Sequence, residues 1–245
     1  MAQSTADAPN VSRIGVTWGD MDAKVIARYA VRETMGLVVM GVALFWPAGR
    51  IDWWPAWAAL AVMAAWTIAT AAVILRWNPA LLIERLGPRK GAKHWDLAIM
   101  SVLGLTQLAR YIVAGLDERY GWTGGIPLGA QATALLACVL GYALVVWATR
   151  SNAFFSQIVR VQPGQTVMMG GPYRYVRHPA YLGAILFELA VPVLLASWWA
   201  FVASGLGLIL LILRTALEDR VLLVELMGYS EYARRVRYRL VPGIW

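Results

Sequence analysis

Long apolar runs separated by shorter polar segments dominate the chain. The runs fall at residues 32–46, 54–75, 97–115, 128–149, 180–196 and 198–214. Most are close to the roughly 20 residues that a helix needs to cross a bilayer. We therefore predict an all-α fold, a polytopic bundle of about six transmembrane helices. The first run is short and predicts a tilted or shallow helix, and Ser197 alone separates the last two, which predicts a tight hairpin.

The composition agrees with a protein that has lipid as its solvent. Hydrophobic residues make up 60% of the 245 residues and charged residues only 15%, whereas soluble domains carry about 25% charged residues. Only one cysteine is present, Cys138, and it lies inside an apolar run. An intrachain disulfide and a cysteine-rich metal site are thereby excluded, and no metal is expected.

Lysine and arginine alternate between the connections of the predicted helices. The segment before the first helix, the second connection, the fourth connection and the C-terminal tail are rich in them, whereas the first and third connections contain only Arg50 and Arg119 and the hairpin turn contains none. The positive-inside rule then predicts that both termini are cytoplasmic. The rich second connection includes Arg85, Arg89 and Lys90.

The net charge of +8 is spread over these connections. We interpret it as a topology signal and a contact with anionic membrane lipids, and not as a nucleic-acid surface. The composition, rich in Ala, Trp and Arg, points to a bacterial inner membrane. Residues 1–22 are mixed and polar, so we expect disorder up to about Asp20 and no cleavable signal peptide.

The most informative segment follows the fourth predicted helix. Turn signals at Pro163-Gly164 and at residues 170–172 bracket a short extended segment, 165–169, and His178-Pro179 then opens the fifth helix. Tyrosine, arginine and histidine side chains thus gather at a helix N-terminus on the cytoplasmic surface, where free N–H groups favour anions. The alternative is an interfacial anchor of tyrosines and arginines.

Charged residues also mark the last helices. Arg214 and Glu218 are four residues apart, so they share one helical face and form either a surface ion pair or part of a polar pocket. Residues 222–232 predict an amphipathic helix that ends at Gly228, followed by a short helix.

Arg110 and Glu188 lie inside predicted spans, where charge is costly. They could pair with each other, line a cavity for a lipid substrate, or snorkel from misplaced helix ends.

Several of these segments together resemble the isoprenylcysteine carboxyl methyltransferase family of integral-membrane enzymes. They are GPYRYVRHPAYLG at 171–183, the acidic pair Glu218-Asp219, GYSEY at 228–232 and YRLVP at 238–242. The resemblance covers about residues 147–245. It divides the chain into a cytosolic segment (1–30), N-terminal transmembrane helices (31–115) and a catalytic membrane domain with a cytosolic tail (116–245).

The resemblance implies S-adenosyl-L-methionine as the methyl donor, held by a cytosolic loop. The residues that it implies for the cofactor are Gln165, Thr166, Val167, Met168, Tyr173, His178, Pro179, Ala180, Tyr181 and Glu218. It assigns catalysis to Arg214 and Glu218. We add Glu188 and Arg110, beside Arg214, as candidates for the substrate cavity. Asp219 stands where the family usually has a second glutamate, and Gln165 where eukaryotic members often have histidine.

The expected function is methylation of a hydrophobic or lipid-like acceptor that enters from the bilayer, with a carboxylate among the candidate groups. One alternative is an NADPH-dependent membrane reductase of the sterol-reductase type, which shares the C-terminal pattern of tyrosine, Arg-Leu and proline. The other is a non-enzymatic membrane protein, although the chain shows no internal repeat of the transporter kind. The nucleophile that takes the methyl group and the oligomeric state stay open.

Overall fold

The computed structural model describes residues 23–86 and 91–245. The predicted disorder up to Asp20, most of the predicted cytosolic segment 1–30, and Arg89 and Lys90 of the second connection lie outside these ranges.

All regular secondary structure in the described residues is helical. Its elements are α1 (Ala23–Ala48), α2 (Trp54–Trp77), α3 (Ala80–Leu86), α4 (His94–Tyr120), α5 (Leu128–Ser151), the 3-10 turn η3 (Gly171–Arg174), α6 (Pro179–Leu194), α7 (Ala200–Glu225) and α8 (Tyr229–Arg235). Five of these helices are long and apolar enough to cross a membrane, and α6 is a shorter apolar helix beside them. The predicted all-α membrane bundle is confirmed, and the chain is an integral, multi-pass membrane protein.

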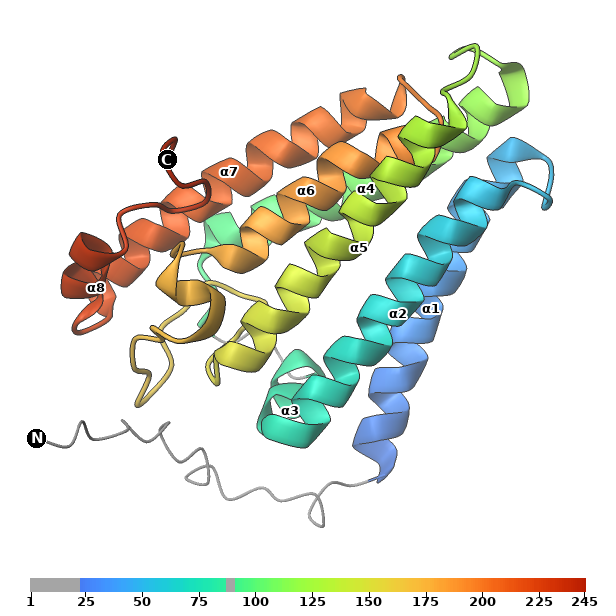
Figure 1. Ribbon diagram of the computed structural model, residues 1–245. Helices are drawn as coiled ribbons and strands as arrows, with labels where there is room; N and C mark the ends of the chain where they lie inside the picture. Colours follow the sequence, from blue (N-terminus) through green and yellow to red (C-terminus); the bar gives the residue numbers. More distant parts are fainter. Residues whose placement is uncertain (1–22, 87–90) are drawn as a thin grey trace, which may run out of the picture.

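The connections separate into two groups at opposite ends of the bundle (Figure 1). The short links α1–α2, α4–α5 and α6–α7 lie together at one end. The short helix α3, the long segment between α5 and α6, and α8 with the C-terminus lie at the other. The arginine-rich segments and the arginine-poor links are thereby separated, as the sequence predicts.

Three of the predicted helix boundaries are wrong by a turn or more, and one of them is the end of α4, which lies at Tyr120 and not at residue 115 because the left-handed Gly121 caps the helix there. The first helix is not short: α1 begins at Ala23, because no proline or glycine interrupts the polar stretch before Arg32 and Tyr29 packs against α2 and α3. The predicted end at Arg214 and the separate amphipathic helix from Leu222 are one continuous helix, α7, because the polar residues after Arg214 have buried partners and no breaker separates them.

Glycine allows α5 and α6 to approach closely beside the site. A Cβ on Gly183 would lie 2.3 Å from the Gly141 carbonyl oxygen, and one on Gly141 would lie 2.6 Å from the Gly183 carbonyl oxygen. The two backbones are therefore in direct contact, a mode of packing that small residues permit between membrane helices. This crossing fixes the N-terminal half of α6 against α5.

Candidate functional site

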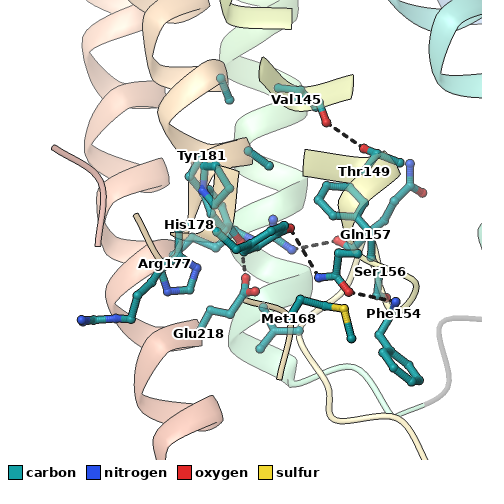
Figure 2. A pocket seen from close by; sticks show the side chains of 18 of the residues that line it. Val145, Thr149, Phe154, Ser156, Gln157, Met168, Arg177, His178, Tyr181 and Glu218 are labelled. Atoms are coloured by element: carbon teal, nitrogen blue, oxygen red, sulfur yellow. Dashed lines mark hydrogen bonds between the residues drawn. The ribbon is translucent and has the colours of Figure 1, made fainter. Parts of the chain in front are cut away.

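A cavity of about 320 Å³ opens among α2, α4, α5, α6 and α7, beside the loop that joins α5 to α6 (Figure 2). Its lining includes every residue that the sequence assigned to the cofactor: Gln165, Thr166, Val167, Met168, Tyr173, His178, Pro179, Ala180, Tyr181 and Glu218. Arg214 and Glu188 also line it. Arg110 lies behind Glu188 and is not among the lining residues. The structure thus brings these segments together around one space.

The start of α6 is held by the C-terminal tail. Pro179 occupies the first turn of α6, as predicted, and His178 is its N-cap. The backbone N–H groups of Arg177 and His178 donate to the carbonyl oxygens of Tyr238 and Arg239, both at 2.9 Å. The tail motif at 238–242 therefore closes one side of the site by main-chain hydrogen bonds.

Asp219 is the buried centre that joins these segments. Its carboxylate is fully buried and accepts a two-pronged contact from Arg177, with Nε–Oδ1 at 2.8 Å and Nη2–Oδ2 at 3.0 Å. Arg239 Nε donates to Oδ2 at 2.7 Å, and the Tyr229 hydroxyl donates to Oδ1 at 2.8 Å. His178 Nε2 lies 3.1 Å from Oδ1. One carboxylate thus links α7 to the start of α6, to α8 and to the tail.

These contacts define how the His178 ring is oriented. An ionised carboxylate only accepts hydrogen bonds, so Nε2 is the nitrogen that carries the proton toward Asp219. In the neutral ring Nδ1 is then an acceptor, and it has no partner among the described residues. A ligand in the cavity can use this nitrogen as an acceptor.

Three tyrosines around the cavity remain neutral hydrogen-bond donors. Burial raises the pKa of Tyr173 and Tyr232, and burial together with the charge of Asp219 raises the pKa of Tyr229. Each hydroxyl therefore keeps its proton at neutral pH. The Tyr232 hydroxyl donates a hydrogen bond to the carbonyl oxygen of Tyr173 at 2.6 Å, and this contact fixes α8 to η3.

Glu218 faces the cavity from α7. Its Oε2 accepts a hydrogen bond from the Tyr181 hydroxyl of α6 (Figure 2). Its Oε1 accepts no hydrogen bond from the part of the chain that the structure describes. The residue is partly buried and lines the cavity, so this oxygen is available to a ligand. A carboxylate with one free oxygen beside an aromatic ring is suited to a cation.

Arg214 lies one turn before Glu218 but does not pair with it, so the predicted alternative of a surface ion pair between them is wrong. Its Nε donates to the fully buried Asp96 of α4 at 2.7 Å, and its Nη2 donates to the Gln157 carbonyl oxygen at 2.8 Å. The guanidinium carbon lies 5.4 Å from the centre of the Tyr181 ring. Nη1 is left without a partner among the described residues, so one donor arm remains for a ligand.

The loop that borders the cavity is held in shape by its own glutamines. Gln165 Oε1 accepts from the Gln162 N–H at 2.8 Å, and Gln162 Nε2 donates to the Phe154 carbonyl oxygen at 2.9 Å. The Gln165 side chain thus holds the loop. The N–H groups of Thr166, Val167 and Met168 donate to no other described residue. The sequence predicted an extended segment here, and the structure has neither helix nor turn over 165–169, so these N–H groups are free to bind a ligand.

Arg110 and Glu188 form a buried ion pair between α4 and α6. Of the interpretations left open by the sequence, the mutual pair is therefore the one the structure shows. Arg110 also contacts the Ser204 and Tyr111 hydroxyl oxygens, both at 3.3 Å. Glu188 additionally lines the cavity, at the end far from the loop.

Several site residues were not found from the sequence. Asp96 holds Arg214, yet at the polar start of α4 it looks like an ordinary first-turn acid. The cavity wall also includes Trp66 and Thr70 of α2. The sequence did not mark these two residues as part of a site, because both lie in an unbroken apolar run. Phe154 and Gln157 follow the fourth predicted helix, where the sequence alone gave them no partner.

The fold and the cavity together define a polytopic membrane protein with a polar, aromatic-lined site at one end of its bundle. Residues 133–224 match the model of the isoprenylcysteine carboxyl methyltransferase family. No curated protein matches the chain. The family match confirms the resemblance predicted from the sequence and supports a membrane methyltransferase. The matched residues include most of α5, the loop, α6 and nearly all of α7; the tail motifs and α1–α4 lie outside them.

Proposed function

We propose that the chain transfers a methyl group from S-adenosyl-L-methionine to a hydrophobic or lipid-like acceptor in the membrane. The observation that carries the proposal is the division of one cavity into two ends. The end under the loop holds Glu218, Tyr181 and unpaired backbone donors, whereas the other end reaches Glu188 inside the bundle. Such a cavity suits a polar donor from water and an apolar acceptor from lipid.

The residues at the loop end fit the donor. The methyl donor is a cationic sulfonium with an ammonium, a carboxylate and a nucleoside. The free Oε1 of Glu218 and the Tyr181 ring can bind positive charge. The N–H groups of residues 166–168 can bind oxygen acceptors, and His178 Nδ1 can accept from an amino group. No metal is needed, and no cluster of metal-ligating side chains occurs in the described ranges.

When bound, the donor supplies a methyl carbon activated by the positive sulfur. A bond forms from the acceptor's nucleophilic atom to that carbon, the carbon–sulfur bond breaks, and its electron pair stays on sulfur. A carboxylate acceptor needs no base, whereas a neutral acceptor must release one proton to water. The protein aligns the reactants and excludes water. Arg214, with Nη1 free, can orient an anionic group of the acceptor.

We place the site on the cytoplasmic side of a bacterial inner membrane, with both termini cytoplasmic. The arginine-rich segments and the cavity mouth share one end of the bundle, and the positive-inside rule assigns that end to the cytoplasm. Basic side chains there also suit anionic membrane lipids.

Cysteine labelling tests this orientation. Arg50→Cys and Arg119→Cys should react with an impermeant maleimide added to intact cells, and Arg234→Cys should react only after lysis. All three positions are exposed, and the native Cys138 is fully buried, so background is small. Labelling of Arg234→Cys in intact cells would place the site outside and overturn the assignment.

A charge-removing variant tests the role of Glu218. Glu218→Gln keeps the size of the side chain but removes its charge. If that charge contributes to the binding free energy, the affinity for S-adenosylhomocysteine should fall by about 10-fold, since a charged hydrogen bond contributes about 1.5–3 kcal/mol. S-adenosylhomocysteine lacks the sulfonium charge. Binding of sinefungin, a cationic analogue of the methyl donor, should therefore weaken more than binding of S-adenosylhomocysteine. Isothermal titration of the purified protein measures both.

The matched control is Glu225→Gln on the same helix. Glu225 forms an ion pair with Lys93 at 2.7 Å and has 40% of its side chain exposed, so its substitution should leave both affinities within two-fold. Equal affinities for wild type and Glu218→Gln would remove Glu218 from the donor site.

A further inference from the structure

We propose that α1, α2 and α4, which the family match does not include, form the binding site for the acceptor. On this inference the acceptor is an amphiphile with one apolar chain and an oxygen that accepts hydrogen bonds near its reacting group. It rests on the proposed function and names the substrate class of that same site.

A second cavity adjoins the main one. A space of about 220 Å³ lies among α1, α2 and α4, and Trp66 and Gln107 line both cavities. The second cavity is otherwise lined mainly by apolar residues, among them Met40, Met63 and Leu108. On this proposal, an acceptor with its head group in the main cavity extends its apolar chain past Trp66 and between these helices.

The second cavity faces the lipid side of the bundle. Its lining residues Gly36, Val39, Gly104 and Leu108 are exposed on the surfaces of α1 and α4. A Cβ built on Gly36 or on Gly104 would meet no atom within 4 Å, so the two glycines leave open space at this fissure. An apolar chain can enter here directly from the bilayer without crossing water.

Two polar atoms without partners lie on the α2 wall of the main cavity, and one of them belongs to Trp66, which also lines the second cavity. Thr70 is 2% exposed, and neither its hydroxyl nor the Trp66 Nε1–H has a hydrogen-bond partner among the described residues. Leaving a buried polar group without a partner is energetically costly, so such groups are normally satisfied. The buried Thr106 and Thr149 illustrate this, because both donate to carbonyl oxygens of their own helices. A ligand oxygen would satisfy Trp66 and Thr70.

The wall beside these atoms is aromatic. The Trp66 ring stacks on Tyr142 with centroids 4.7 Å apart, and Tyr142 contacts Phe187 at 4.4 Å. All three rings line the main cavity, and the wall ends at the Arg110–Glu188 pair. This aromatic wall provides a rigid apolar surface for the part of the acceptor's apolar chain that lies between the reacting group and the fissure.

Blocking the fissure tests the path of the chain. Gly104→Trp should fill the open space without moving the backbone, and Gly129→Trp is the matched control, because a Cβ there also meets nothing and Gly129 lines neither cavity. The probe is palmitic acid with a mid-chain diazirine, photo-crosslinked to the purified protein and mapped by peptide mass spectrometry. We expect crosslinks on residues 33–40 and 104–111 in wild type and Gly129→Trp, reduced at least ten-fold in Gly104→Trp.

Removing the Thr70 hydroxyl tests the polar contact. Thr70→Val should raise the melting temperature of the ligand-free protein, because it removes an unsatisfied buried group, and should weaken probe binding several-fold. Thr106→Val removes a satisfied hydroxyl and should not weaken probe binding. A purely structural role for Thr70 predicts unchanged probe binding.

Crosslinks spread over the outer faces of all helices, or equal crosslinking in Gly104→Trp and Gly129→Trp, would overturn the inference. Neither readout requires methyl transfer. Failure of the proposed function would instead appear as an absence of S-adenosylhomocysteine binding by wild type, so the two failures are distinguishable.

Discussion

Arg214→Lys should reduce methyl transfer by at least about 100-fold while S-adenosylhomocysteine binding stays within a few-fold. Arg214 donates Nε to Asp96 and Nη2 to the Gln157 carbonyl oxygen, and these two contacts fix the guanidinium plane of a residue that lines the cavity and leave Nη1 without a described partner. Lysine is a point charge on a flexible stem and cannot make the three contacts in one plane. Loss of one well-oriented donor at a reacting centre costs about 10²–10³ in rate. The measurement is transfer of labelled methyl to a bacterial total-lipid extract in detergent micelles.

The structure provides a control that separates chemistry from stability. Asp96→Asn weakens the same tie between α4 and α7 but leaves the Arg214 side chain in place, since asparagine retains an oxygen acceptor. If Arg214 only fastens the helices, both variants should lose turnover in proportion to their loss of melting temperature. We expect Arg214→Lys to lose far more turnover than Asp96→Asn at equal melting temperature. Normal methyl transfer by Arg214→Lys would remove it from the reaction.

Asp219→Asn should destabilise the end of the bundle that carries α8 and the tail by about 3–5 kcal/mol, the typical cost of removing one partner of a buried ion pair. The substitution leaves Arg177, itself 7% exposed, without its two-pronged carboxylate, and it weakens the contacts of Arg239, Tyr229 and His178. The tail and α8 should detach first, because Asp219 is their common partner. Limited proteolysis in detergent should therefore cut after α7 in the variant and not in wild type.

Glu231→Gln is the control for this prediction. Glu231 pairs with Arg235 on the surface of α8, with side chains 59% and 67% exposed, so its loss should change stability by at most about 1 kcal/mol. Equal proteolysis of wild type and Asp219→Asn would show that Asp219 does not hold the tail.

Much of the fold follows from the sequence because each span carries its own signal. Apolar length and the distribution of arginine depend only on neighbouring residues, so the helices and their alternation between two ends were predicted. The ends of α1 and α7 were not, because polar residues stay helical when distant partners bury them. Arg214 illustrates this: its partner Asp96 is 118 residues away.

The site, too, has a part that local sequence predicts and a part that depends on distant contacts. Residues within 165–181 lie together because turns and a proline at Pro179 impose local geometry, and the family resemblance added Arg214 and Glu218. The α2 wall carries no such signal, since Trp66 and Thr70 are ordinary residues of a membrane helix until folding leaves their polar atoms without partners. Asp219 was predicted only as the second acid of a pair, because its four partners come from three separate segments.

The most direct test of the central claim is a competition between two cofactors on the purified wild-type protein. S-adenosylhomocysteine and NADPH are titrated separately by isothermal calorimetry, and each is then added in excess to the other. We predict saturable, one-to-one binding of S-adenosylhomocysteine that Glu218→Gln weakens, and no binding of NADPH. Saturable binding of NADPH with none of S-adenosylhomocysteine would contradict the methyltransferase assignment and favour a membrane reductase.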